Sequence, residues 1–154
     1  MFTRQKGAEA IQFRDGKYVG ESNLNYFLMR IAYGDITGDG NEEAIILLRG
    51  QNTPVSRTLD EIFIYGQKNG RASLLANFEG GKRGDYILSI SRLGSNFKVE
   101  NNVLVIDQAT AVEGDNNCIP TRYYTIKYCW NGSQMVEAER TDLKSIPENM
   151  REIG

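Results

Sequence analysis

The sequence GDITGDGNEE, residues 34–43, runs directly into the apolar segment AIILL, residues 44–48. Oxygen-bearing side chains occupy every second position of the first segment: Asp35, Thr37, Asp39, Asn41 and Glu43. Oxygens in this register can converge on one hard cation, and Ca²⁺ takes about six to eight of them. Gly40, directly after Asp39, permits the sharp bend that such a loop needs. We therefore predict a calcium loop that leads into a buried β-strand.

The predicted ligand set differs from that of an EF-hand. An EF-hand loop ends on a bidentate Glu and leads into a helix, whereas the matching position counted from Asp35 is Ile46. Glu43 is therefore assigned as the closing carboxylate, and Asp35 and Asp39 supply the other two. A loop of Asp, Gly and Asn that binds no metal is the alternative, because these residues are common turn formers.

The remaining loop residues are assigned by their chemistry. Thr37 is expected to bind Ca²⁺ through its side-chain oxygen and Asn41 through its backbone carbonyl. Glu42 lies between the predicted ligands and is expected to point to solvent.

Length and charge limit the class of protein. The chain has 154 residues, which fits a single β-rich domain over residues 1–154 with a core large enough to fold without a metal. An ion is then expected to order a region rather than create the fold. The net charge of −2 comes without a basic stripe, so no nucleic-acid partner is expected. No apolar run has the length of a membrane span, and residues 1–7 do not resemble a signal peptide.

The chain contains no histidine, which removes Ser-His-Asp and Cys-His catalysis and histidine-ligated catalytic zinc. A carboxylate-based hydrolase such as a glycosidase remains as an alternative, with Glu113 and Asp115 as its acids. The two cysteines, Cys118 and Cys129, do not have Cys-x-x-Cys spacing. They either form a disulfide or remain two free thiols.

Turn dipeptides between β-forming segments decide the fold class. Hairpins are predicted at Asp15-Gly16, Asn69-Gly70, Asn101-Asn102 and Asn131-Gly132. The sequence therefore predicts an all-β, antiparallel meander of about nine or ten strands. A curved sheet, a sandwich and an open barrel all fit this pattern, and the tail can hold one short C-terminal helix after Pro147.

An aromatic face is predicted on the strand before the last of these turns. Tyr124, Tyr128 and Trp130 alternate along it together with Ile126. We interpret this face as part of the core, with a sugar-binding platform as the alternative.

Several segments resemble known proteins. Residues 34–44 are similar to the Asp-x-Thr/Asn-Gly-Asp-Gly loop of FG-GAP and VCBS calcium motifs. Further segments resemble a group of uncharacterised, often exported bacterial β-rich domains: residues 62–65, 69–71, 74–76, 116–121 and 128–132. The resemblance implies calcium binding and an extracytoplasmic setting, periplasmic or secreted, with the leader absent from this sequence. FG-GAP motifs usually recur as propeller blades, and the single loop here does not favour a propeller.

These observations predict a calcium-stabilised, non-enzymatic binding or accessory domain of an exported bacterial protein. Its expected partner is a protein or a carbohydrate of unknown identity. A second alternative, beside the hydrolase, is a structural subunit that pairs with a partner through an exposed sheet edge. A long edge with few charges would favour that alternative.

Overall fold

The computed structural model describes residues 2–3, 10–11, 14–19, 24–52, 57–79, 86–87, 97–110, 112–115 and 121–148. These residues contain no helix and form strands that pair antiparallel throughout, which confirms the predicted all-β class. The strands are β1 (Phe2–Thr3), β2 (Ala10–Ile11), β3 (Lys17–Val19), β4 (Leu24–Gly34), β5 (Glu43–Asn52), β6 (Arg57–Lys68), β7 (Arg71–Glu79), β8 (Tyr86–Ile87), β9 (Phe97–Glu100), β10 (Val103–Thr110), β11 (Arg122–Trp130), β12 (Met135–Arg140) and β13 (Lys144–Ser145).

Nine of these strands have three or more residues, in line with the expected nine or ten, and β1, β2, β8 and β13 have two each. The short helix considered after Pro147 falls almost entirely on residues 149–154, outside the described residues.

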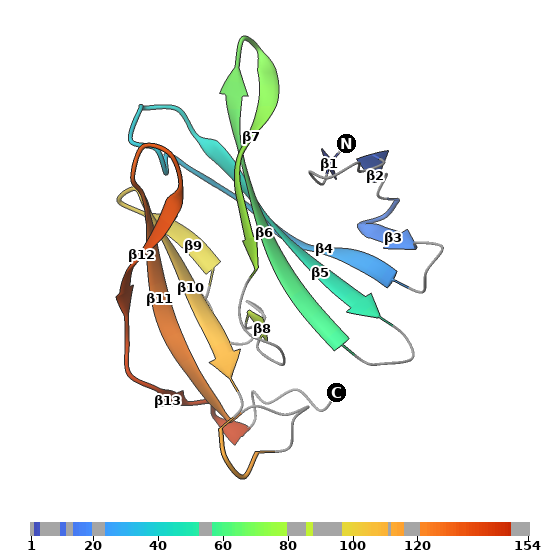
Figure 1. Ribbon diagram of the computed structural model, residues 1–154, viewed down its shortest axis with the longest axis vertical. Coiled ribbons are helices and arrows are strands. Elements are labelled where there is room, and N and C mark those ends of the chain that lie inside the picture. The colour runs from blue at the N-terminus through green and yellow to red at the C-terminus, as the bar shows by residue number, and fades with distance from the viewer. Residues whose placement is uncertain are drawn as a thin grey trace.

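The strands form two main sheets. One has five strands in the order β3-β4-β5-β6-β7, and the other has six, in the order β12-β11-β10-β8 with β9 on β10 and β13 on β11. Strands β1 and β2 make a separate pair. Figure 1 shows that the five-stranded sheet is strongly curled and that β9, β10, β11 and β12 form a second layer beside it. Among the architectures considered, the structure is a pair of packed sheets, one of them curled.

The predicted turns are present, although at Asp15-Gly16 a single bridge between Arg14 and Lys17 joins the two sides, and β2 and β3 pair with β1 and β4 instead of with each other. Asp15-Gly16, Asn69-Gly70 and Asn101-Asn102 all have φ between 50° and 74°, the left-handed values that a two-residue hairpin turn requires. The Asn131-Gly132 hairpin is also present, but its loop spans residues 131–134 because β12 begins only at Met135. The Asn131 side-chain oxygen accepts the N–H groups of Ser133 and Gln134 at 3.0 Å, which stabilises this longer loop.

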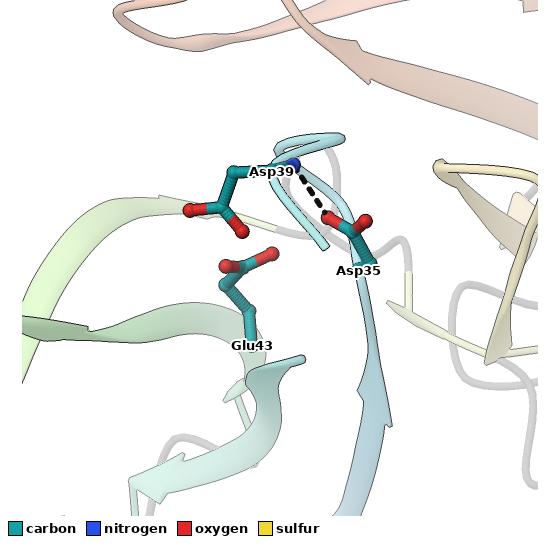
Figure 2. Close-up of side chains that lie close together, drawn as sticks. All are labelled: Asp35, Asp39 and Glu43. Carbon is teal, nitrogen blue, oxygen red and sulfur yellow. Dashed lines mark hydrogen bonds between the residues drawn. The ribbon is translucent and has the colours of Figure 1, made fainter. Parts of the chain in front are cut away.

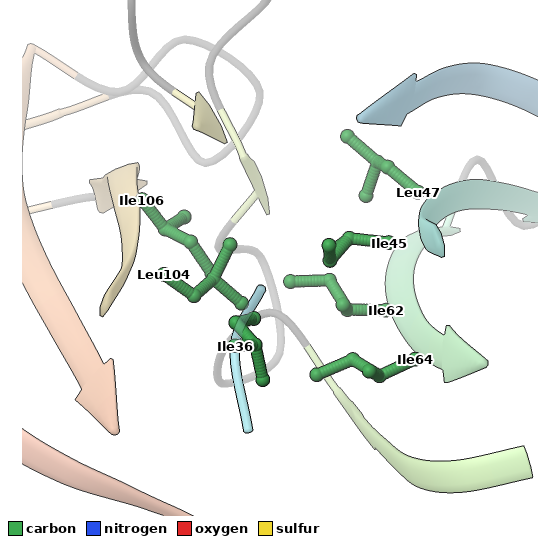
Figure 3. Packing of buried hydrophobic residues seen from close by; sticks show 7 residues of the cluster. All are labelled: Ile36, Ile45, Leu47, Ile62, Ile64, Leu104 and Ile106. Atoms are coloured by element: carbon green, nitrogen blue, oxygen red, sulfur yellow. The ribbon is translucent and has the colours of Figure 1, made fainter. Parts of the chain in front are cut away.

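The main core lies between the two sheets. Buried side chains from β5, β6 and β10 meet there: Ile45, Leu47, Ile62, Ile64, Leu104 and Ile106. Ile36 joins them from the loop between β4 and β5, and Figure 3 shows it between the two layers. Tyr128 and Trp130 pack against this core and Ile126 is fully buried, so this part of the predicted aromatic face belongs to the core. Tyr124 is half-buried, and the Arg140 guanidinium lies 4.8 Å from its ring centroid.

The opposite face of the five-stranded sheet carries a second buried cluster of Tyr26, Ile46, Leu48 and Phe63. Strand β5 therefore has apolar side chains on both faces. Successive side chains of a strand alternate between the faces, so a strand buried on both sides needs an unbroken apolar run. This explains why residues 44–48 read AIILL rather than alternating with polar residues.

Candidate metal centre

The loop of residues 35–42 connects two neighbouring strands of the curled sheet. Gly34 at the end of β4 pairs with Glu43 at the start of β5, so both ends of the loop are held side by side. Gly38 and Gly40 adopt φ of 77° and 89°, which is backbone geometry that side chains with a Cβ rarely adopt. The two glycines let the loop turn back sharply between its fixed ends.

The Asp35 carboxylate organises the first part of the loop. One oxygen accepts the N–H groups of Gly38 at 2.7 Å and Asp39 at 3.1 Å, and the other accepts the N–H of Gly40 at 2.9 Å. The Asp39 carboxylate also accepts a backbone hydrogen bond, because its Oδ1 accepts the N–H of Asn41 at 2.8 Å. These bonds turn the backbone N–H groups inward and fix the two carboxylates in place.

Glu43 closes the loop from the β5 side and is buried, with 3% of its surface exposed. Its Oε2 accepts the N–H groups of Ile36 at 2.8 Å and Thr37 at 3.1 Å. Its Oε1 accepts the Thr37 hydroxyl at 3.3 Å. A buried carboxylate is stable only when hydrogen bonds or a cation compensate its lost hydration, and here backbone amides supply part of that compensation.

Three carboxylates converge at this point. Oxygen atoms of Asp35, Asp39 and Glu43 all lie within 4.8 Å of one another, and Figure 2 shows the three side chains directed toward a shared space. Within the part of the chain that the structure describes, no Lys or Arg forms an ion pair with any of them. The cluster therefore concentrates negative charge that a cation can neutralise.

The outcome for the other loop residues is mixed. Thr37 places its hydroxyl beside Glu43, next to the cluster. Asn41 donates hydrogen bonds to Asp39 from its backbone N–H and its side-chain Nδ2. That the Asn41 backbone carbonyl binds the ion stays a prediction. Glu42 is exposed, as expected.

The loop is also attached to the second sheet, which the sequence did not indicate. Ile36 inserts into the core between the sheets with 2% of its surface exposed. The Asn102 side chain, in the β9-β10 turn, donates a hydrogen bond to the backbone carbonyl of Asp35. Val99 of β9 packs against Gly34, whose missing Cβ would lie 2.6 Å from it. An isoleucine between the predicted ligands is a signal that one loop residue faces the core, but no local signal marks Asn102.

The acids considered for hydrolysis do not form a comparable site. Glu113 is exposed. The Asp115 carboxylate accepts hydrogen bonds from the Val112 N–H and from the N–H and hydroxyl of Thr121, at 2.7 to 3.0 Å. These hydrogen bonds hold the pKa of Asp115 below its ordinary value, and the bond from the Val112 N–H has the largest effect. A general acid needs a raised pKa instead. Cys129 carries a free thiol, and Cys118 lies outside the described residues.

Comparisons with protein families, with curated proteins and with solved structures find no match for this chain. The resemblance to FG-GAP and VCBS motifs therefore stays a prediction. Among the described residues, no helix has the length and apolar character needed to cross a membrane.

Proposed function

We propose that residues 35–43 bind one Ca²⁺ ion and that the ion stabilises a non-enzymatic binding or accessory domain. The observation that carries the proposal is the convergence of Asp35, Asp39 and Glu43 within 4.8 Å, without an ion pair among the described residues. Carboxylate and hydroxyl oxygens are the ligands that Ca²⁺ prefers, and its coordination tolerates the irregular geometry of a loop better than that of Mg²⁺.

The attachment of the loop to the second sheet supports a structural role for the ion. Ca²⁺ would hold Asp35 and Glu43 together. Asp35 precedes Ile36 in the chain and Glu43 accepts the Ile36 N–H, and the Ile36 side chain packs between the sheets. An ion at this position would therefore stabilise the contact between the sheets as well as the loop. Extracellular calcium sites typically bind with dissociation constants of about 10⁻⁴ to 10⁻³ M, which suits the proposed exported bacterial setting.

Thermal unfolding tests the proposal. Protein stripped with EDTA is compared with protein in millimolar calcium. At about 10 mM calcium, roughly ten to a hundred times such a dissociation constant, an ion that binds only the folded state adds about 1.4 to 2.7 kcal/mol, which raises the melting temperature by roughly 3–10 °C. No rise for the unmodified protein would contradict the proposal.

Two variants separate the metal from the hydrogen bonds of the loop. Asp39→Asn and Glu43→Gln keep an acceptor oxygen for the backbone N–H groups but remove the negative charge. Both should fold in EDTA and lose the calcium-dependent rise. Asp142→Asn, at an exposed aspartate outside the loop, is the matched control and should keep the full rise. An undiminished rise in Asp39→Asn would place the ion elsewhere.

A further inference from the structure

The outer edge of β4 is only partly covered by another strand. Strand β3 pairs with residues 25–27 of β4, and the Gly16 carbonyl accepts the N–H of Leu28 at 2.7 Å. On its other side, β4 pairs with β5 as far as Gly34. No strand in the described residues pairs with the outer side of residues 31–33. Figure 1 shows β3 beside one end of β4 only.

The side chains along this part of β4 are unusually apolar for an edge. Met29, Ile31 and Tyr33 are 40%, 39% and 64% exposed, and they are three of the five large exposed hydrophobic residues found among the described residues. Edge strands of monomeric proteins are usually protected by charges, proline, a β-bulge or a covering element. Here Arg30 is the one charged residue between Leu28 and Gly34. Met29 is the extra residue of a β-bulge, and regular pairing with β5 resumes at Arg30, so residues 30–33 form a regular strand segment beyond the part that β3 covers.

We propose that this edge pairs antiparallel with the same edge of a second copy of the chain. A two-fold axis at Ile31 would place Ile31 opposite its own copy and Arg30 opposite Ala32, and would bring the bulged Met29 near Tyr33 at each end of the pairing. Ile31 then faces an apolar residue, Tyr33 lies beside Met29, and no like charges lie directly opposite each other. This self-complementarity is what an isologous two-fold interface requires.

The surroundings of the edge limit the length of the pairing. The turn at Asp15-Gly16 lies next to Leu28, and Val99 of β9 packs over Gly34 at the other end. Four residues in regular strand geometry, 30–33, and the bulged Met29 are left for pairing between these two boundaries. The pairing joins the two five-stranded sheets into one continuous sheet. An interface of this size is expected to be weak, so it forms at high protein concentration.

Measurement of the molar mass in solution is the first test. Sedimentation over a wide range of concentrations should show a mass that rises from the 17.3 kDa of one chain toward twice that value. Ile31→Lys places like charges directly opposite each other and should raise the dissociation constant at least about tenfold. Leu143→Lys changes an exposed leucine (47% exposed) outside β4 and should leave the association unchanged. A monomer at every concentration, or a dimer unaffected by Ile31→Lys, would overturn the proposal.

Cross-linking gives a second test that does not depend on a destabilising substitution. Ile31→Cys should form a disulfide-linked dimer under mild oxidation, because opposite residues of antiparallel strands have Cβ atoms about 4.5–5.5 Å apart. Val19→Cys is the control, since Val19 is more exposed (66%) but lies outside the proposed pairing segment. The unmodified chain controls for the native cysteines. Equal cross-linking of Val19→Cys and Ile31→Cys would show that collision rather than pairing joins the chains.

Discussion

Gly34 illustrates how one missing side chain shapes the packing of the two sheets. A Cβ at this position would lie 2.6 Å from both Cβ and Cγ1 of Val99, well inside contact distance. No positive φ is involved, so the glycine serves close approach rather than turn geometry. Because Gly34 has no side chain, β9 can lie directly over the end of β4, next to the acidic loop.

Gly34→Ala should lower the free energy of unfolding by about 1–3 kcal/mol, because the new methyl group overpacks this contact. Urea unfolding measures the change. Combining it with Val99→Ala should recover part of the loss, which a double-mutant cycle would detect as coupling.

Gly66→Ala provides the comparison for that experiment. A Cβ added at Gly66 would lie 2.9 Å from the Cδ1 of Leu75, which is the end of a side chain that can move aside. The cost should therefore be smaller than at Gly34. An equal cost at both positions, or no coupling with Val99→Ala, would show that the clash with β9 is not the cause.

At the scale of elements, the acidic loop and the β9-β10 hairpin act as one unit. The loop belongs to the first sheet and the hairpin to the second, and the bond from Asn102 to the carbonyl of Asp35 joins positions 67 residues apart. This contact restrains the residue that carries the first carboxylate of the cluster. If Asp35 binds the proposed ion, this restraint is expected to strengthen binding, since less conformational freedom is lost.

Asn102→Gly tests this coupling without straining the turn. Asn102 has φ of 64°, which glycine adopts readily, so only the side-chain bond is lost. Relative to its control, the variant should lose about 1 kcal/mol of stability in urea unfolding. Calorimetric titration should show calcium affinity weakened by up to about fivefold.

The control is Asn69→Gly, in the β6-β7 turn. Asn69 has φ of 52° and is exposed, so the same change is made in the same kind of turn. It should leave calcium affinity unchanged. If both variants bind calcium equally well, the hairpin has no part in organising the loop.

At the scale of the whole molecule, carboxylates held by hydrogen bonds make stability depend on pH. Bonds from Val112 and Thr121 lower the pKa of Asp115 from its ordinary value of 3.8. Near and below that value, the unfolded chain binds a proton more readily than the folded one. The contribution of Asp115 is thus complete above pH about 4 to 5 and is lost as the pH falls further.

Urea unfolding in EDTA from pH 7 down to about pH 3 measures this effect. Asp115→Asn should be less stable than the unmodified protein near neutral pH, and the difference should shrink as the pH falls. Glu113→Gln, at the exposed neighbouring acid, should follow the unmodified protein throughout. A difference that stays constant with pH would show that ionisation of Asp115 does not contribute.

The sequence alone was enough to determine the fold class and the positions of the turns. Asn-Gly and Asp-Gly pairs favour the positive φ of hairpin turns, so turns such as Asp15-Gly16 and Asn69-Gly70 were predictable from neighbouring residues. The spacing of Asp35, Asp39 and Glu43 likewise indicated that their carboxylates would converge, because a short loop brings alternate side chains to one side.

Only the tertiary structure decided how the two sheets meet and what the loop contacts. The contacts of Gly34 with Val99 and of Asp35 with Asn102 join residues far apart in the chain, and no local preference encodes such a pairing. The incomplete pairing of the outer edge of β4 among the described strands has the same origin, since β3 pairs only with residues 25–27. Turn geometry is determined by the conformational preferences of adjacent residues, whereas the packing of sheets depends on side chains that meet only after the chain has folded.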